Sequence, residues 1–346
     1  MTAEQEKAVN LIKSGGATCW PRLEPRPAYP PASVMVRQFL TEYISFTLQA
    51  ALVGVATRPC YDRLAHWFYA TLAAPCAAMK WVPRWVAPED FLFSIGLCLA
   101  INVTYCAVNG FFALCDARGY LQHYKCPRHP AQEPSRALVT RALTKQAISH
   151  LVTAPILMLL IVGPYFRSNN AAAADPAAAP GFTTLWWQLA VCHTINDMWF
   201  YWGHRLLHSR ALYASIHKQH HQYVATRSYA AEHSEVSEAI FTAYLPYLAG
   251  LALVGAHFHT VNVWFMCRIV ETYEAHSGYA FAGSLADRLH LVRPRNAAHH
   301  DFHHTGNRGG FGTEFHDWMF GTDDAWHAGG GFEGYIAGRG KKAKRA

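Results

Sequence analysis

The chain has 346 residues, of which 51% are hydrophobic, 14% are aromatic and only 15% are charged. Soluble domains usually carry about 25% charged residues, and disordered chains are rich in charge and poor in aromatic side chains. The composition therefore argues against an ordinary water-soluble enzyme and excludes a disordered chain. The formal net charge is +7, but the cations are not gathered into one stripe, so no nucleic acid is expected as a partner.

An N-terminal arm, residues 1–38, precedes the apolar part of the chain. Met1–Gly16 mixes glutamate and lysine and lacks the apolar stretch of a cleavable signal peptide. Leu23–Pro31 is rich in proline. We therefore expect membrane insertion to depend on internal segments.

Residues 39–203 contain the segments that we expect to cross a membrane. Phe91–Leu114 and Ala147–Phe166 hold no charged residue, and Thr183–Gly203 holds a single acid. Each has about 20 residues or more, which is enough to cross roughly 30 Å of hydrocarbon. Phe39–Ala56 is a fourth candidate, weakened by one glutamate. A large soluble helical core is the alternative interpretation.

A weaker pair of apolar segments follows, at Ala239–Ala256 and His259–Thr272, interrupted by Pro246 and Gly255. The pair is expected to form a short hairpin or to lie partly in the membrane interface. The sequence then divides into an arm at 1–38, a transmembrane region at 39–203, a histidine-rich region at 204–327 that includes the apolar hairpin 239–272, and a basic tail at 328–346.

Loop charges predict the orientation in the membrane. Residues 118–145 carry six lysines or arginines against one acid, whereas residues 167–182 carry one arginine and one aspartate. Because cytoplasmic loops are enriched in lysine and arginine, the first loop is expected in the cytosol and the second in the lumen. The helix from Thr183 then returns to the cytosol near His204.

The C-terminal tail carries lysines at the third and fifth positions from its end. This is the spacing of a dilysine retrieval signal of endoplasmic-reticulum membrane proteins, and it indicates a multi-pass protein of that membrane. A generic basic tail close to anionic lipid is the alternative.

Histidine is the anomaly of the composition, because 17 of the 21 histidines lie in residues 193–346. Three boxes stand out: HRLLH at 204–208, HKQHH at 217–221 and HDFHH at 300–304. Positions i, i+3 and i+4 share one face of a helix, so each box presents two or three imidazoles in one direction. Neutral imidazole binds iron, zinc, copper and nickel well. Eight converging imidazoles exceed the needs of one tetrahedral ion, so two metal ions are predicted.

Other residue patterns narrow the metal chemistry. The HExxH motif of zinc hydrolases is absent, and so are the Glu-x-x-His ligands of soluble helical di-iron proteins. A carboxylate-poor iron pair beside a bilayer suits oxygen activation on a lipid. Asp197 lies seven residues before His204 on the same helical face and is a costly charge for a membrane segment, so we predict that it orients an imidazole at the catalytic site. Arg268 and Glu271, at i and i+3, are expected to pair.

At these residues the chain resembles the fatty acid hydroxylase superfamily of membrane di-iron oxygenases, and within it the C-4 methylsterol monooxygenases. Order and intervals match across roughly residues 90–326. The segments that carry the resemblance are Tyr201–His208, Ile216–His221, Glu271-Thr272, His276–Tyr279, His299–His304, Asp317-Trp318 and Phe320–Thr322.

The resemblance implies an all-α fold: an integral membrane helical bundle with about four transmembrane helices and a cytosolic-facing, helical histidine-box domain for two metals. Glu238 matches a family glutamate and is expected at the catalytic site. Methylsterol oxidases commonly read AEYAHPLE before it, whereas residues 231–238 here read AEHSEVSE, which puts the C-4 methyl specificity in question. The implied metal ligands are His204, His208, His217, His220, His221, His276, His300, His303 and His304, with His299 as an additional ligand or hydrogen-bond donor.

The resemblance also implies a reaction in sterol biosynthesis. Two iron ions (Fe2+/Fe3+), O2 and electrons from NAD(P)H, delivered by cytochrome b5 and its reductase, would oxidise a C-4 methyl group of a membrane-held sterol through alcohol and aldehyde to carboxylate. The basic loop 118–145 is expected either to attract acidic cytochrome b5 or only to set the topology.

Several alternatives stay open from sequence. The same superfamily includes sterol C-5 desaturases, sterol side-chain hydroxylases and fatty acyl hydroxylases. A catalytically silent membrane scaffold or a metal-binding protein would also retain the boxes.

Overall fold

A computed structural model of the protein describes residues 27–338, and those residues contain helices and no β-strand. Most of the N-terminal arm and the dilysine-like spacing lie outside the described residues. The predicted all-α class is confirmed for this part of the chain. The α-helices are α2 (Ala32–Thr71), α3 (Ala73–Ala77), α4 (Pro88–Arg118), α5 (Arg136–Ile148), α6 (Ala154–Leu157), α7 (Gly163–Asn169), α8 (Phe182–Leu207), α9 (Val236–Ala239), α10 (Leu245–Leu253), α11 (Phe258–Ala275), α12 (Leu285–Arg288), α13 (Pro294–Gly306), α14 (Glu314–Phe320), α15 (Asp324–Ala328) and α16 (Gly331–Ala337).

Local sequence signals set the ends of the helices. Helix α4 starts with Pro88, whose fixed φ suits a first turn, and carries Glu89 and Asp90 near the positive end of the helix dipole. It ends at Gly119, which has a φ of 67°, a conformation that stops helices and favours glycine. Helices α5, α6 and α7 are joined by π-helical turns at Ser149–Thr153 and Met158–Val162 into one long rod.

Among residues 27–338, four stretches are long and apolar enough to cross a membrane, which agrees with the predicted number. Three of them lie where expected: α2, α4 and Pro130–Asn169, which contains α5 to α7. The fourth is Val236–Leu253, which contains α9 and α10. This differs from the sequence prediction, which counted Thr183–Gly203 among the spans and treated residues 239–256 as part of a weaker apolar pair.

The reason for this difference is the polar face of α8. The helix forms over the expected segment, but it buries Gln188, His193, Asn196 and Asp197 inside the protein. A count of charged residues overlooks uncharged polar side chains that face the interior of the bundle. For this reason the sequence prediction treated α8 as a membrane-spanning helix.

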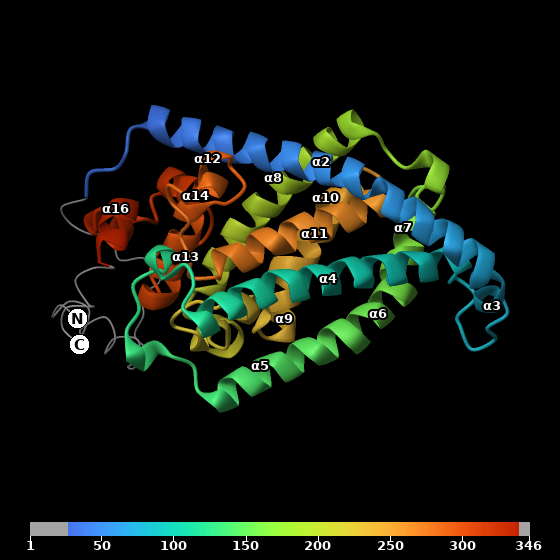
Figure 1. The fold of residues 1–346 in the computed structure, drawn as a ribbon, viewed down its shortest axis with the longest axis horizontal. Helices are drawn as coiled ribbons and strands as arrows, with labels where there is room; N and C mark the ends of the chain where they lie inside the picture. The colour runs from blue at the N-terminus through green and yellow to red at the C-terminus, as the bar shows by residue number, and fades with distance from the viewer. Residues whose placement is uncertain (1–26, 339–346) are drawn as a thin grey trace.

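The helices lie mostly along the long axis of the molecule (Figure 1). Helix α11 packs against α4 and α2, and α8 packs against α2 and α10. The largest apolar core joins these five helices through side chains such as Phe46, Phe93, Leu189, Leu251 and Trp264.

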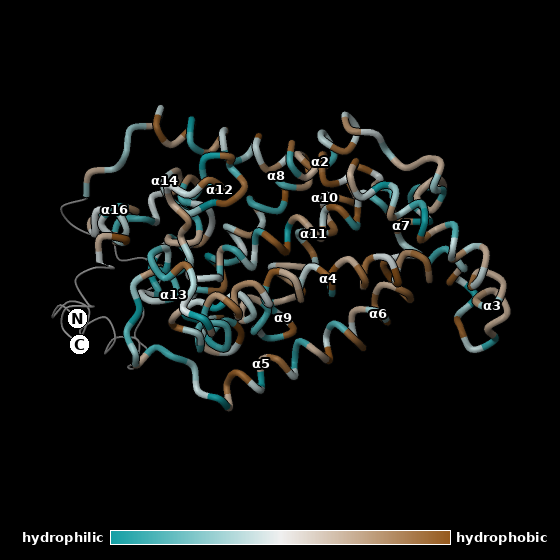
Figure 2. Tube along the Cα trace, viewed as in Figure 1, coloured by the Kyte–Doolittle hydropathy of each residue, from teal (hydrophilic) through white to brown (hydrophobic). Residues whose placement is uncertain are grey.

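The two ends of the bundle differ. Helices α13, α14 and α16 gather at one end, and α3 and α7 lie toward the other (Figure 1). Hydrophilic residues are frequent at the end that carries α13, whereas α4 and α6 are largely hydrophobic (Figure 2). The histidine boxes belong to the hydrophilic end.

Candidate metal centre

Four separate stretches of chain deliver histidines to one buried region. His204 lies in the last turn of α8, and His208 caps that helix. A π-helical turn ends at His217, and a 3-10 turn begins at His220. The remaining members are His221 of the same turn, His276 at the C-cap of α11, and His300, His303 and His304 of α13; all nine are buried.

The first group, the five-histidine group, consists of His204, His208, His217, His221 and His303. One ring nitrogen from each lies within 4.8 Å of all the others. The Nε2 atom of His217 is 3.0 Å from Nε2 of His204 and 3.1 Å from Nε2 of His221. Nε2 of His221 is 3.2 Å from that of His303 and 3.3 Å from that of His208. These rings therefore point at a common centre.

The second group, the four-histidine group, consists of His220, His276, His300 and His304. Nε2 of His276 lies 3.2 Å from Nε2 of His220 and 2.9 Å from that of His300. Nε2 of His304 is 3.2 Å from that of His300. The two groups adjoin, because His221 of the first stacks on His304 of the second with 4.6 Å between ring centroids.

The outer nitrogens show which way these imidazoles are oriented. Four of the nine rings place Nδ1 against a backbone carbonyl oxygen, which can only accept a hydrogen bond, so Nδ1 carries the hydrogen. A fifth ring, that of His217, places Nδ1 against a carboxyl oxygen of Glu238. In a neutral imidazole, Nε2 then has a free lone pair. The pairs are His204 with the Phe311 carbonyl (2.9 Å), His217 with Glu238 Oε1 (2.9 Å), His276 with the Thr272 carbonyl (2.9 Å), His303 with the Gly309 carbonyl (2.5 Å) and His304 with the Tyr223 carbonyl (3.0 Å).

Burial keeps all nine rings neutral. It lowers the pKa of His204 and of His276 to about 4. For the other seven, burial and the neighbouring imidazoles lower the pKa well below its usual value. Inward-facing lone pairs about 3 Å apart repel each other, and a cation between them removes that repulsion. Groups of five and four neutral nitrogens therefore fit a pair of metal ions.

His299 lies outside both groups, although the sequence made it a candidate ligand. Its Nε2 is 2.9 Å from Oδ1 of Asp323, and Asp317 completes a third buried cluster. Burial disfavours the charged ring, but the Asp323 carboxylate outweighs it and raises the pKa of His299 to about 9. His299 thus forms an ion pair beside the centre.

Asp317 of the Asp-Trp segment supports the centre indirectly, and the sequence assigned it no such role. Its carboxylate accepts hydrogen bonds from the backbone nitrogens of Phe311 (3.1 Å) and Gly312 (2.8 Å). These bonds fix the loop whose Gly309 and Phe311 carbonyls hold two of the histidines. At Gly310, φ is 67° and an added Cβ would lie 2.8 Å from Cβ of His303. In the sequence, the consecutive glycines Gly309 and Gly310 were the signal that the backbone passes close to another residue here.

The two acids predicted for the site are placed differently. Glu238 is buried, and its Oε1 contacts Nδ1 of His217. Asp197 instead lies 3.4 Å from Nε2 of His193 and 3.6 Å from the Arg268 guanidinium. Within residues 27–338, its recorded hydrogen-bond and ion-pair partners include no box histidine. Seven residues of helix cover about 10.5 Å, which is too far for an aspartate to reach His204.

The contrast between these acids gives a testable prediction. Glu238→Gln should weaken metal binding about 10–100-fold, because partners that orient a ligating histidine contribute by that order. Asp197→Asn should leave the metal affinity unchanged. Metal competition with a chelator on the purified variants measures both. Equal losses in the two variants would contradict the placement of the acids.

The remaining sequence predictions near the site have clear outcomes. Arg268 and Glu271 do form an ion pair, and Arg293 also contacts Glu271. His233, the histidine displaced from its family position, lies 3.2 Å from the Gln222 amide oxygen, outside both histidine groups.

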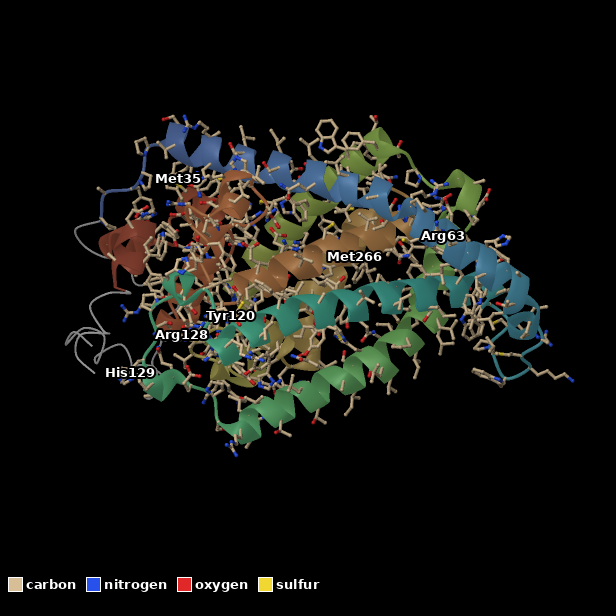
Figure 3. The ribbon with its side chains drawn as sticks, in the orientation of Figure 1. Met35, Arg63, Tyr120, Arg128, His129 and Met266 are labelled. Carbon is tan, nitrogen blue, oxygen red and sulfur yellow. The ribbon has the colours of Figure 1, made fainter. Side chains whose placement is uncertain are left out.

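Most cations of the loop 118–145 contact the protein itself. Arg128 donates to the Thr226 carbonyl (2.6 Å) and lies near the α13 end (Figure 3). Lys125 pairs with Asp116, and Arg141 and Lys145 bond to Gln222 and to the Ser234 carbonyl. These cations therefore fasten the loop to the histidine-rich region, which limits the charge available to an external partner.

Comparison with known proteins identifies a matching family model and several similar proteins. The model of the fatty acid hydroxylase family matches residues 189–322, which include all nine histidines. Methylsterol monooxygenase 2-2 of Arabidopsis thaliana is 31% identical over 220 residues, covering 62% of this chain and 79% of the relative. Very-long-chain aldehyde decarbonylase GL1-8 of Oryza sativa is 38% identical over 149 residues, covering 42% and 54%. C-4 methylsterol oxidase of Schizosaccharomyces pombe is 28% identical over 218 residues, covering 61% and 70%. No solved structure matches the chain.

Proposed function

Since the chain belongs to the fatty acid hydroxylase family, we propose that it is a membrane-bound di-iron oxygenase that oxidises C-4 methyl groups of sterol precursors. The observation that carries the proposal is the convergence of nine buried, neutral histidines in two adjoining groups. His204, His208, His217, His221 and His303 would hold one iron, and His220, His276, His300 and His304 the other. When bound, the two ions supply the reduction of O2 and the oxidation of an unactivated C–H bond.

The protein's own contribution is to orient the ligands and exclude water. The carbonyls of Phe311, Gly309, Thr272 and Tyr223 hold the Nδ1 hydrogens of four histidines, so their Nε2 atoms stay directed inward. Glu238 does the same for His217. All nine rings are buried, so the centre is shielded from bulk water, which prevents loss of a reactive species to side reactions.

The sterol substrate is supported by the relatives. The methylsterol monooxygenase of A. thaliana matches over 79% of its length, whereas the aldehyde decarbonylase match covers 54% of that relative. The first oxidation balances as R–CH3 + O2 + NAD(P)H + H+ → R–CH2OH + NAD(P)+ + H2O. The second balances as R–CH2OH + O2 + NAD(P)H + H+ → R–CHO + NAD(P)+ + 2 H2O, and the third as R–CHO + O2 + NAD(P)H + H+ → R–COOH + NAD(P)+ + H2O. Cytochrome b5 and its reductase are the proposed electron carriers, and the endoplasmic reticulum membrane, with the histidine-rich end in the cytosol, is the proposed location.

Microsomes that contain the full-length chain should convert labelled 4,4-dimethylsterol into a 4-carboxysterol when O2 and NADPH are supplied. The host should lack its own C-4 methyl oxidase, so that the product reports this chain alone. A new ring double bond or a side-chain alcohol would instead assign the desaturase or side-chain hydroxylase reaction. An alkane from a long-chain aldehyde would assign the decarbonylase reaction. Unchanged sterols despite full metal loading would overturn sterol oxidation.

A further inference from the structure

A shallow groove of about 540 Å³ runs beside the first half of α2, and no member of the two histidine groups lines it. One row of its lining is polar and is formed by Ser33, Arg37, Thr41 and Ser45. Residues four apart lie on the same helix face, and twelve residues of helix cover about 18 Å. The groove therefore offers a continuous polar edge along α2.

The parallel row of the groove is apolar. Val36, Leu40 and Ile44 are also four residues apart, and they are 40%, 46% and 45% exposed. His290 of the loop 283–293 forms the opposite wall, and its neighbours Leu289 and Leu291 are 56% and 58% exposed. An elongated ligand with a polar head and a hydrocarbon body matches such a surface.

The basic side chains at the groove indicate the charge of the ligand's head group. Within residues 27–338, the guanidinium of Arg37 and the ring of His290 form no hydrogen bond or ion pair. The acid that acts on His290 is the partly buried Glu42, whose carboxyl binds the Gln38 amide. Arg288 is an exposed cation of the same loop and has no recorded partner in that range either. A cation on a largely apolar wall favours an anionic head group with a lipid tail.

The position of the groove points to a source for this ligand. Helix α2 is a candidate membrane span, and its first half lies at the end of the bundle that carries α14 (Figure 1). The loop charges predict that this end faces the cytosol. Anionic phospholipids are enriched in the cytoplasmic leaflet, where each lysine or arginine near the surface contributes about 1 kcal/mol to binding.

We propose that the groove binds one anionic phospholipid of the cytosolic leaflet. Its phosphate contacts Arg37 and His290, and an acyl chain lies along Val36, Leu40 and Ile44. The proposal concerns binding alone and is independent of the reaction proposed above.

A lipid in this groove bridges two parts of the chain that matter for the metal centre. The loop 283–293 connects His276 to α13, so it joins members of the four-histidine group. Gln49 of α2 donates to the His290 carbonyl (2.8 Å), and the Arg293 guanidinium lies 4.6 Å from the Phe46 ring centroid. A bound lipid adds a third connection between α2 and this loop and stabilises both.

The test uses the full-length, iron-loaded protein in dodecyl maltoside micelles, titrated with dioleoyl phosphatidylserine and followed by thermal unfolding. Phosphatidylserine should raise Tm saturably, and an equal amount of phosphatidylcholine should raise it much less. Arg37→Ala should weaken the apparent affinity about fivefold, since 1 kcal/mol converts to that factor. His290→Ala should weaken it further in the double variant.

Arg63→Ala is the matched control, because Arg63 is an exposed arginine of the same helix far from Met35 and the groove (Figure 3). Its affinity should equal that of the unmodified protein. Equal losses in Arg37→Ala and Arg63→Ala, or equal effects of the two lipids, would show general charge attraction and overturn the proposal. Full stabilisation by soluble glycerophosphoserine would overturn the lipid assignment, which requires the acyl chain.

Discussion

Replacing His303 with alanine should remove one of two metal ions and abolish most of the activity. His303 belongs to the five-histidine group, and its Nε2 lies 3.2 Å from that of His221. Losing this donor leaves the four-histidine group complete, so the iron content should fall from about two ions per chain to about one. Product formation should fall by at least about 100-fold, because removing even an outer partner of a ligand costs 10–100-fold.

In the four-histidine group the corresponding change is His276→Ala. It should also leave about one iron ion per chain, in this case the ion held by the five-histidine group. His66→Ala is the control, because His66 is an exposed histidine of α2, and it should keep two ions and full activity. Elemental analysis and turnover of 4,4-dimethylsterol measure these outcomes. Full iron content in both group variants would contradict the assignment of these histidines as ligands.

The second prediction is that the metal-free protein loses stability steeply as the pH falls below about 6.5. Burial lowers the pKa of His204 and His276 from 6.5 to about 4 in the folded chain. Between these values the unfolded chain takes up protons that the folded chain does not, so the free energy of unfolding decreases with falling pH. Each such histidine contributes about 1.4 kcal/mol per pH unit, or about 3 kcal/mol by pH 4. The contribution is fully present above pH 6.5.

Thermal unfolding of chelator-treated and iron-loaded protein between pH 7.5 and 5 checks this prediction. The metal-free protein should show a falling Tm from pH 6.5 downward, whereas the loaded protein should hold its Tm until the metal is released. A flat Tm for the metal-free protein over this range would mean that the rings are accessible to protons, against their observed burial.

The grouping of the histidines shows what spacing can and cannot predict. Helical spacing indicates that the members of a box lie together, and the structure does bring nine of the ten candidates into two groups. Within each three-histidine box, the i and i+4 members share a group and the i+3 member belongs to the other: His220 is separated from His217 and His221, and His303 from His300 and His304. Spacing within a box cannot predict how the boxes combine, for example that His303 joins the histidines of α8 while His276 joins His300 and His304.

The supporting contacts were harder to foresee than the ligands. The carbonyls of Phe311 and Gly309 leave no mark in a side-chain pattern, because any residue has a carbonyl. Their position depends on the positive φ at Gly309 and Gly310 and on the Asp317 carboxylate. For Asp197 the sequence predicted a contact that the structure does not contain. Asp197 shares a helical face with His204, but the two are separated along the helix axis, and Asp197 lies beside the Arg268 guanidinium instead.

The membrane helices were predictable where hydropathy and exposure agree. Helix α4 and the rod from α5 to α7 have apolar side chains all round, such as Val103 and Ile161, which are 59% and 61% exposed. Helix α8 carries Gln188, His193 and Asn196, which lower its mean hydropathy, and it buries them inside the protein. A count of charged residues overlooks these side chains, whereas mean hydropathy separates α8 from the four candidate spans.

The most direct test of the account is iron X-ray absorption spectroscopy of the purified full-length protein, combined with elemental analysis. The account predicts two iron ions per chain, with first-sphere scattering dominated by imidazole nitrogens. A single ion per chain, or ligation dominated by carboxylate oxygen or sulfur, would contradict it.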